Sequence, residues 1–258
     1  MLRPRIIPSL LVHKKGLVKT EEFKQSKYVG DPINAVKIFN EKEVDELIVL
    51  DIDATIENRG PDFKMIKNLA VECRMPFCYG GGVTTVDEAK KIVQLGAEKV
   101  AFSSAAINNL SLLKQVGAVI GVQSVVVVLD YKKKGIFGKL EIFTHNGNKA
   151  TGKGLFDFVK VLDGIGVGEI VLNSIERDGK MKGYDITTVE KVRDVFQGPI
   201  TVLGGAGKLE DIKTLINKFK IIGAAAGSLF VFKGKYKAVL INYPTFEEKK
   251  FFFNFYEK

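Results

Sequence analysis

Val49-Leu50-Asp51-Ile52 recurs as Val171-Leu172-Asn173-Ser174, roughly half the chain length further on. Two segments rich in small residues recur in the same order, and the matched pairs are Gly80-Gly81-Gly82 with Gly204-Gly205, and Ala101-Phe102-Ser103-Ser104 with Ala225-Ala226-Gly227-Ser228. Because order and spacing are both kept, the pattern favours an internal repeat over chance similarity between glycine-rich turns. The sequence therefore predicts two half-units, at about residues 1–120 and 121–258.

Short runs rich in Val and Ile, each nearly continuous in hydrophobicity, alternate along the chain with longer amphipathic runs. This is the pattern of parallel strands that are buried on both faces and connected by helices. The expected strands are Arg5–Val12, Glu46–Ile52, Met75–Tyr79, Lys99–Ser103, Ser124–Asp130, Glu169–Asn173, Ile200–Leu203 and Ile221–Ala225, with a further hairpin strand at Leu140–Thr144. The expected helices include one that opens at Asp31-Pro32, then Val86–Val93 and Leu209–Phe219.

Eight strands with helices between them predict one (β/α)8 barrel, a TIM barrel, over residues 1–258. Neither half-unit could close its sheet edges alone, which favours one barrel over two domains. A doubly wound α/β sheet is the alternative, but the G-x-G-x-x-G of dinucleotide-binding members is missing after the first strand.

The 258 residues carry 39 Lys and Arg against 30 Asp and Glu, a net charge of +9. The basic residues are spread out, the longest run being Lys132-Lys133-Lys134, so we expect no nucleic-acid partner. No apolar run is long enough to span a membrane and no signal cleavage site is recognisable, so we expect a cytoplasmic protein without membrane contact. Cys73 and Cys78 show no zinc pattern, and His13 and His145 stand apart, so no metal or cofactor is expected.

Two carboxylates are expected at the mouth of the barrel, because Asp130 ends the fifth predicted strand and Asp51 ends the second. Side chains at the C-terminal ends of barrel strands point into the active-site mouth, where a carboxylate can act as general acid or base. Lys19 lies in the glycine-bounded segment Gly16–Gly30, which is a candidate lid. The repeat matches Asp130 with Leu11, which cannot transfer a proton.

Glycine-rich turns follow the third and seventh predicted strands, and Ser103-Ser104 and Gly227-Ser228 follow the fourth and eighth. Glycine lets backbone N–H groups approach an anion, serine adds a hydroxyl, and a helix N-terminus adds its dipole. Loops after strands seven and eight form the commonest phosphate site of such barrels, and the repeat places a second site opposite. A phosphorylated small molecule, most simply a bisphosphate, is therefore the expected ligand.

A set of short motifs carries a family resemblance: Arg5-Ile6-Ile7-Pro8, Gly16-Leu17-Val18-Lys19, Gly30-Asp31-Pro32, Asp45-Glu46-Leu47, Leu50-Asp51-Ile52, Gly80-Gly81-Gly82, Val126–Asp130, Ser174-Ile175-Glu176-Arg177-Asp178-Gly179, Gly183-Tyr184-Asp185 and Gly204-Gly205-Ala206-Gly207-Lys208. Over almost its full length the chain resembles the cyclase subunit of imidazole glycerol phosphate synthase. The resemblance implies a half-barrel-repeat (β/α)8 fold and a heterodimer with a glutaminase docked at the N-terminal barrel face. Ammonia from that partner would cross the barrel and react with a bisphosphate ribulosyl nucleotide, giving imidazole glycerol phosphate and an aminoimidazole carboxamide ribotide.

The resemblance also assigns roles to individual residues. It implies phosphate binding by Gly82, Ser103, Ser104, Gly179, Gly205, Gly227 and Ser228, and substrate binding by Asp178. It implies an acid/base role for Asp130, and in a histidine-pathway cyclase we expect Lys19 and Asp51 to help it. It further implies an ammonia gate formed by Arg5, Glu46, Lys99 and Glu169. Each of these four begins a predicted strand, so all four should lie at one end of the barrel, where opposite charges can pair.

The chain departs from the family at the catalytic centre. The family uses two aspartates, at the positions of Leu11 and Asp130, and here the first motif reads Leu10-Leu11-Val12. This is similar to a divergent branch that accompanies surface-polysaccharide or flagellar-glycan synthesis, where the barrel supplies ammonia to a separate sugar amidotransferase. The first expectation is therefore an ammonia-conducting subunit for acetamidino-sugar synthesis, with a cyclase site impaired by Leu11.

Two alternatives stay open beside that expectation. One is a true lyase and cyclase of histidine biosynthesis, with Asp130 as the main acid and base. The other is a stand-alone binding protein or isomerase for a sugar phosphate, which Leu11 disfavours because such isomerases also need two carboxylates. The aromatic and basic tail, Lys249–Tyr256, is expected to form a last helix packed on the barrel rather than a membrane contact.

Overall fold

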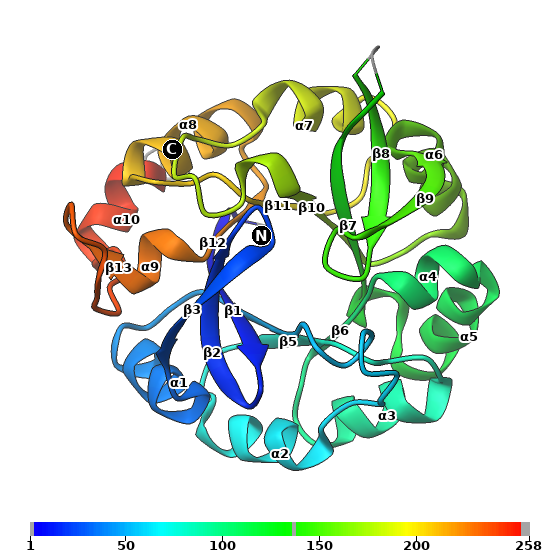
Figure 1. Cartoon of the computed structure of the whole chain (residues 1–258), viewed down its shortest axis with the longest axis horizontal. Helices are drawn as coiled ribbons and strands as arrows, with labels where there is room; N and C mark the ends of the chain where they lie inside the picture. Colours follow the sequence, from blue (N-terminus) through cyan, green and yellow to red (C-terminus); the bar gives the residue numbers. More distant parts are fainter. Residues whose placement is uncertain (1–2, 136–137, 254–258) are drawn as a thin grey trace.

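The central sheet closes on itself. In this computed structural model, which describes residues 3–135 and 138–253, eight parallel strands form a barrel (Figure 1). In ring order they are β1 (Arg5–His13), β4 (Leu47–Asp51), β5 (Phe77–Gly80), β6 (Lys99–Phe102), β7 (Val125–Lys134), β10 (Glu169–Ser174), β11 (Ile200–Leu203) and β12 (Gly223–Ala226). Pairing of β7 with β10 and of β12 with β1 completes the ring, so the predicted (β/α)8 barrel is confirmed.

Helices surround the barrel (Figure 1). Those in the described residues are α1 (Pro32–Glu41), α2 (Phe63–Glu72), α3 (Val86–Gln94), α4 (Ser104–Asn108), α5 (Leu110–Ile120), α6 (Leu155–Ile165), α7 (Ile186–Arg193), α8 (Leu209–Phe219), α9 (Ser228–Val231) and α10 (Phe246–Phe253), with 3-10 turns η1 (Val122–Ser124) and η2 (Ile175–Arg177). Local signals explain where helices begin. The Asp31 carboxylate accepts a 2.9 Å hydrogen bond from the Asn34 N–H ahead of α1, and Thr85 and Glu88 form a capping box on α3.

Successive strand residues face opposite sides of the sheet, so each strand contributes to two cores. Outward-facing residues such as Val49 and Leu172 belong to the large core between strands and helices. Inward-facing residues form a separate apolar cluster inside the barrel, made of Ile7, Ile48, Cys78, Ala101, Val126, Val128, Val171, Leu203 and Ala225. The barrel interior is therefore apolar along its middle.

Two antiparallel hairpins extend the barrel beyond its C-terminal end. β2 (Gly16–Glu21) and β3 (Lys24–Gly30) continue from β1, while β8 (Lys139–Thr144) and β9 (Lys149–Gly154) continue from β7. The predicted hairpin strand is confirmed as β8, and the candidate lid is the β2–β3 hairpin. The prediction that Asp130 ends its strand is wrong, because Asp130 and the residues up to Lys134 pair with β8.

The described part of each predicted half-unit contributes four barrel strands, and in each the first of these strands leads into a hairpin. The arrangement agrees with an internal repeat, and the division into half-barrels stays a prediction.

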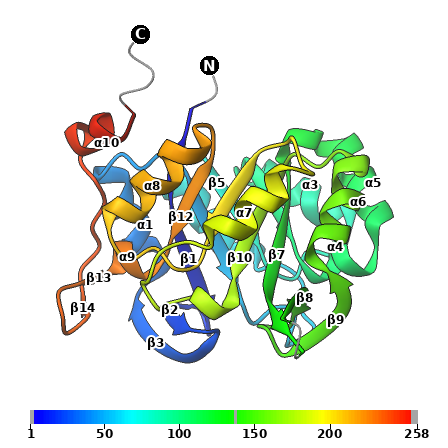
Figure 2. The same cartoon turned by 90° about the horizontal axis from the view of Figure 1, so that it is seen from above.

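The C-terminal segment runs along the outside of the barrel. β13 (Phe232–Lys233) and β14 (Ala238–Val239) form a small hairpin, and α10 lies beside α8 on the side where β1 begins (Figure 2). The predicted last helix is present as α10, while positions 254–256 of the predicted stretch lie outside the described residues. Among the helices of the described residues, none has the length and apolarity needed to cross a membrane.

Candidate functional site

A cavity of about 460 Å³ lies at the end of the barrel where the parallel strands finish. Every residue predicted to act in catalysis, phosphate binding or substrate binding lines it: Lys19, Asp51, Gly82, Ser103, Ser104, Asp130, Asp178, Gly179, Gly205, Gly227 and Ser228. Leu11 also lines this cavity. The fold thus brings residues from both half-units into one pocket.

Asp130 stands on the cavity wall within β7. The side-chain amide of Asn173, on the adjacent strand β10, donates a 2.8 Å hydrogen bond to one Asp130 oxygen. Burial raises the pKa of Asp130 to about 7, while the hydrogen bond from Asn173 acts in the opposite direction. A carboxyl group with this pKa can both accept and release a proton near neutral pH.

Lys19 reaches into the cavity from β2. Its buried ammonium donates to the backbone carbonyl of Ser9 on β1. It also lies against the loop that precedes α9, since a Cβ added to Gly227 would be 2.7 Å from Lys19 Nζ. Burial lowers the pKa of Lys19 to about 8, against the opposing effect of Asp178. Lys19 therefore places a positive charge that is easily lost beside a predicted phosphate loop.

Asp178 anchors the β2–β3 hairpin at the cavity. Its carboxylate accepts a 2.8 Å hydrogen bond from the Thr20 hydroxyl and a 3.4 Å bond from the Phe23 N–H, and its backbone carbonyl accepts from the Glu22 N–H at 3.1 Å. Burial raises the pKa of Asp178, and the Thr20 hydrogen bond and the charge of Lys19 lower it by less. The hairpin that carries Lys19 is thus docked on the loop that follows β10.

The carboxylate of Asp51, unlike that of Asp130, is surrounded by hydrogen-bond donors. Arg59 binds both oxygens, at 2.7 and 2.8 Å, and the Asp53 and Ala54 N–H groups donate to one of them at 3.1 and 3.3 Å. The Asp51 side chain is only 2% exposed whereas that of Arg59 is 37% exposed, so the carboxylate is shielded while the guanidinium of this bidentate pair reaches solvent. The contacts favour a role for Asp51 in holding the loop between β4 and α2, with Arg59 beside the Gly82 turn.

The two predicted phosphate turns have the same construction in space. Gly82 has φ +72°, and a Cβ there would lie 2.5 Å from the carbonyl oxygen of Arg59. Gly205 has φ +110°, and a Cβ there would lie 2.2 Å from the carbonyl oxygen of Gly183. Both positions require glycine for conformation and for space. Each turn is therefore packed tightly against a neighbouring loop at the cavity wall.

The N-terminus of a short helix lies next to each of the two glycine turns, α4 next to the Gly82 turn and α9 next to the Gly205 turn. Ser103 precedes α4 and its hydroxyl makes no capping bond, while Gly227 precedes α9. Because β5 and β6 stand opposite β11 and β12 in the ring, the two sets of turns face each other across the cavity. Backbone N–H groups at turns and helix starts of this kind suit phosphate groups.

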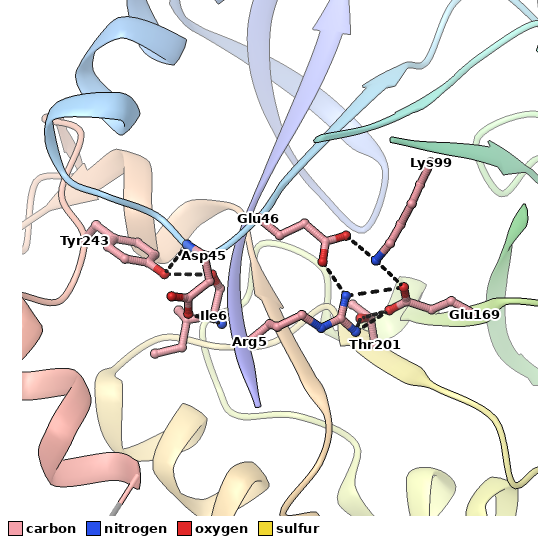
Figure 3. Close-up of polar contacts among 8 residues, drawn as sticks. All are labelled: Arg5, Ile6, Asp45, Glu46, Lys99, Glu169, Thr201 and Tyr243. Carbon is pink, nitrogen blue, oxygen red and sulfur yellow. Dashed lines mark hydrogen bonds and ion pairs between the residues drawn. The ribbon is translucent and has the colours of Figure 1, made fainter. Parts of the chain in front are cut away.

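A second group of charged residues lies at the other end of the barrel, where the strands begin (Figure 3). Arg5 contacts Glu46 and Glu169, the latter at 2.7 Å, and Lys99 Nζ lies 2.7 Å from Glu46 and 2.8 Å from Glu169. The Thr201 hydroxyl also donates to Glu169. Burial disfavours all these charges, but their mutual attraction outweighs it, raising the pKa of Arg5 and Lys99 and lowering that of Glu169. We call these four charged residues, Arg5, Glu46, Lys99 and Glu169, the charged ring.

The family model described as "Histidine biosynthesis protein" matches residues 5–237. The chain is 55% identical over 250 residues to the Vibrio vulnificus protein named "Putative imidazole glycerol phosphate synthase subunit hisF3", covering 97% of this chain and 96% of the relative. This chain belongs to the HisF-type cyclase family. It is also 53% identical to a Leptospira borgpetersenii protein named "Putative imidazole glycerol phosphate synthase subunit HisF", over 98% of this chain and 100% of that one. A Natranaerobius thermophilus "Imidazole glycerol phosphate synthase subunit HisF" is 39% identical, over 90% and 92%.

The names of these HisF relatives bear on the expected function. They point to imidazole glycerol phosphate synthase, and none of the three mentions glycan synthesis. The comparisons therefore support the alternative, a cyclase of histidine biosynthesis, better than the first expectation of a subunit for acetamidino-sugar synthesis.

Leu11 lies in the first half of the barrel at the position that corresponds to Asp130 in the second half. Leu11 pairs with Val18 in the hairpin that follows β1, and Asp130 pairs with Phe143 in the hairpin that follows β7. Both side chains line the cavity. The repeat-based match of Leu11 with Asp130 thus agrees with the geometry, and one side of the cavity has an apolar side chain where the other has a carboxyl group.

Sequence reasoning missed several polar residues of the cavity wall, among them Arg59, His145 and Asn173. The repeat as written in the sequence matches Asn173 with Asp51, and this match is one residue out, because Asn173 lies beside Asp130 as Leu50 lies beside Leu11. Arg59 and His145 lie in loops with no repeat or periodicity to mark them. Within the described ranges, no group of His, Cys, Asp and Glu is arranged to hold a metal ion.

Proposed function

We propose that this chain is the cyclase subunit of an imidazole glycerol phosphate synthase, acting on a ribulosyl bisphosphate with ammonia supplied by a glutaminase subunit. One arrangement carries the proposal: the charged ring, the apolar interior and the phosphate-binding cavity follow one another along a single barrel. The relatives named as subunits of this synthase support it.

The apolar interior suits ammonia in its neutral form. Ile7, Ile48, Cys78 and Ala101 belong to the cluster that separates the charged ring from the cavity. Transfer of an ammonium ion into such surroundings costs far more than transfer of neutral ammonia. We therefore place the glutaminase at the end with the charged ring, and the ring acts as a gate that only the neutral molecule passes.

The cavity supplies what a bisphosphate substrate needs. Its opposed turns, built around Gly82 and Gly205, would hold the two phosphates, and Lys19 would add a positive charge at the turn that contains Gly227. A substrate held at both ends would cross the cavity in front of Asp130. Positioning of this kind accounts for much of the rate enhancement in reactions between two molecules.

Asp130 supports proton transfer without a second aspartate. With its pKa raised to about 7 by burial, it can exchange a proton near neutral pH, and Lys19, with a pKa of about 8, offers a second acid in the same cavity. Asp51 was predicted as a further acid/base group. Because both of its oxygens bind Arg59, we assign it an orienting role.

An assay of the purified chain alone tests the proposal. The ribulosyl bisphosphate is supplied with excess ammonium at alkaline pH, so that no glutaminase is needed. We expect turnover on the order of 1 per second, within the ordinary enzyme range. Asp130→Asn should reduce turnover by about 10²- to 10⁴-fold. Asp87→Asn, on the exposed face of α3, is the control and should leave turnover unchanged.

A second candidate function is favoured by Leu11 alone. An apolar residue opposite Asp130 fits a barrel that conducts ammonia to a separate sugar amidotransferase and performs little cyclase chemistry itself. The same assay separates the candidates. Absence of turnover in the natural chain, with turnover gained in Leu11→Asp, would contradict the first proposal and support the second. Recovery of a glutaminase and a sugar amidotransferase with the chain from its source cell would add to that support.

A further inference from the structure

The backbone ladder between β1 and β4 is open at the end with the charged ring. The first paired residues of the two strands are Ser9 and Ile48. Three residues earlier on each strand, the same register would place Ile6 opposite Asp45. At that position side chains replace backbone pairing. The Ile6 N–H donates to the Asp45 carboxylate at 2.9 Å.

Tyr243 fills the remaining gap from outside the barrel. Its hydroxyl donates to the Ile6 carbonyl oxygen at 2.8 Å and accepts from the Asp45 N–H at 3.1 Å (Figure 3). The side chain is buried, and its ring contacts that of Phe230, with centroids 5.3 Å apart. One hydroxyl group thus satisfies a backbone acceptor on β1 and a backbone donor just before β4.

Lys249 of α10 binds the segment just before β4 through its charge. Its ammonium lies 3.1 Å from an Asp45 carboxylate oxygen and 3.1 Å from the Glu43 carbonyl oxygen. The Lys249 side chain is 11% exposed and that of Asp45 is 6% exposed, so water weakens this pair little. The C-terminal segment is therefore fastened to the start of β4 by two side chains.

These contacts lie one residue from the charged ring on both strands. Arg5 precedes Ile6, Glu46 follows Asp45, and Arg5 and Glu46 form an ion pair with each other. We propose that Tyr243 is a positioning residue of the charged ring, setting the separation of the two backbones that carry Arg5 and Glu46. The inference rests on the proposed function, in which this ring admits ammonia.

The physical reason is that the ion pair depends on backbone placement. Loss of the Tyr243 hydroxyl leaves the Ile6 carbonyl oxygen and the Asp45 N–H without this partner in a place with little access to water. The two strand ends can then move apart to admit water or together to pair directly. Either movement changes the geometry between Arg5 and Glu46 without altering the charge of the ring.

The test compares two buried tyrosines that lose the same group. In Tyr243→Phe the hydroxyl that holds Ile6 is removed, while in the matched control, Tyr184→Phe, the hydroxyl that donates to the Ala225 carbonyl oxygen at 2.9 Å is removed. The chain has six arginines, so the side-chain N–H signals of Arg5 can be followed by NMR in the ¹⁵N-labelled protein and assigned with Arg5→Lys.

We expect the Arg5 signals to shift and to exchange with water severalfold faster in Tyr243→Phe than in the natural chain. Tyr184→Phe should lower thermal stability comparably and leave those signals in place. Equal Arg5 signals and exchange rates in both variants would overturn the positioning role.

A second measurement uses the complex with the glutaminase. We expect Tyr243→Phe to lower glutamine-supported product formation severalfold and to leave ammonium-supported formation nearly unchanged, because added ammonium enters at the cavity end. Equal effects on both would also overturn the inference. Failure of the natural chain to form product from either source would overturn the proposed function alone, since the Arg5 measurement needs no turnover.

Discussion

Asn173 and Asp130 are register partners on β10 and β7, and the Asn173 amide donates a 2.8 Å hydrogen bond to the Asp130 carboxylate. The other polar atom of that amide, Oδ1, is buried without a partner among the described residues. Asn173 therefore acts on Asp130 through its N–H group alone. Its hydrogen bond opposes the rise in pKa that burial imposes on Asp130.

Removal of this bond should shift the pH dependence of activity. Asn173→Leu keeps the side-chain volume but lacks the donor, so the pKa of Asp130 should rise above its value of about 7. A hydrogen bond to a charged group contributes about 1.5 kcal/mol, so the acidic limb of kcat/KM should move by about one pH unit toward alkaline pH. Asn146→Leu, which removes another amide of the cavity wall, is the control. An unchanged limb in Asn173→Leu would contradict the assignment of Asp130 as the base.

Lys19 should control the alkaline limb of substrate binding. Its pKa of about 8 means that it is charged below that pH and neutral above it, so KM for the bisphosphate should rise as pH increases through about 8. Lys19→Met should raise KM by about tenfold near neutral pH, the effect of about 1.4 kcal/mol, and abolish this pH dependence. Lys19→Arg keeps the charge at all these pH values. Persistence of the same limb in Lys19→Met would show that another group is responsible.

Glu169 should be essential for stability near neutral pH. Glu169→Gln leaves Arg5 and Lys99 with half of their compensating charge, and breaking a buried ion pair costs about 3–5 kcal/mol. The folded-state pKa of Glu169 is lowered, so its contribution is present above the unfolded-state pKa and is lost as pH falls through the folded-state value. Urea unfolding near pH 7 and near pH 4 measures this, and the difference between the two proteins should shrink at the lower pH.

Glu72→Gln provides the matched control for that experiment. Glu72 pairs with Lys37 at 3.5 Å on the surface, where the two side chains are 34% and 53% exposed. Its loss should cost less than about 1 kcal/mol. Similar losses for Glu169→Gln and Glu72→Gln would contradict the view that the charged ring is shielded from water.

The Gly205 turn should tolerate no side chain. Gly205→Ala adds a Cβ at φ +110° and 2.2 Å from the Gly183 carbonyl oxygen, so stability should fall by about 1–3 kcal/mol and KM for the bisphosphate should rise. Gly164→Ala, inside α6, meets no atom within 4 Å and should instead stabilise by about 0.5–1 kcal/mol. Thermal unfolding of both variants, with substrate titration of the first, checks these signs. A Gly205→Ala protein with normal stability and KM would remove the basis for assigning a phosphate to this turn.

Local sequence patterns predicted most of the fold. β11 and α8 have the predicted bounds at both ends, and α1 begins at the predicted Asp31-Pro32 signal. The β2–β3 hairpin was not predicted as paired strands, because β3 is mainly polar and has Tyr28 66% exposed, so it shows no periodic burial. The predicted end of the fifth strand at Asp130 was wrong for a related reason, since its continuation pairs only with a hairpin.

The internal repeat predicted the site better than any single motif did. It indicated that turns around Gly82 and Gly205 would face one cavity, and it matched Leu11 with Asp130. It did not indicate that Arg59 would occupy both oxygens of Asp51, because Arg59 lies in a loop without a recognisable partner in the second half.

The amino-acid sequence by itself determined the order of strands and helices, the repeated turns and the presence of residues suited to a charged ring. These properties are encoded in neighbouring residues, through hydrophobic periodicity, caps and glycine. Only the tertiary structure decided that burial raises the pKa of Asp130 to about 7, and that Tyr243 bonds to Ile6, 237 positions away in the chain. The pKa of a side chain and its hydrogen-bond partners depend on which distant segments surround it, and the closed barrel decides those surroundings.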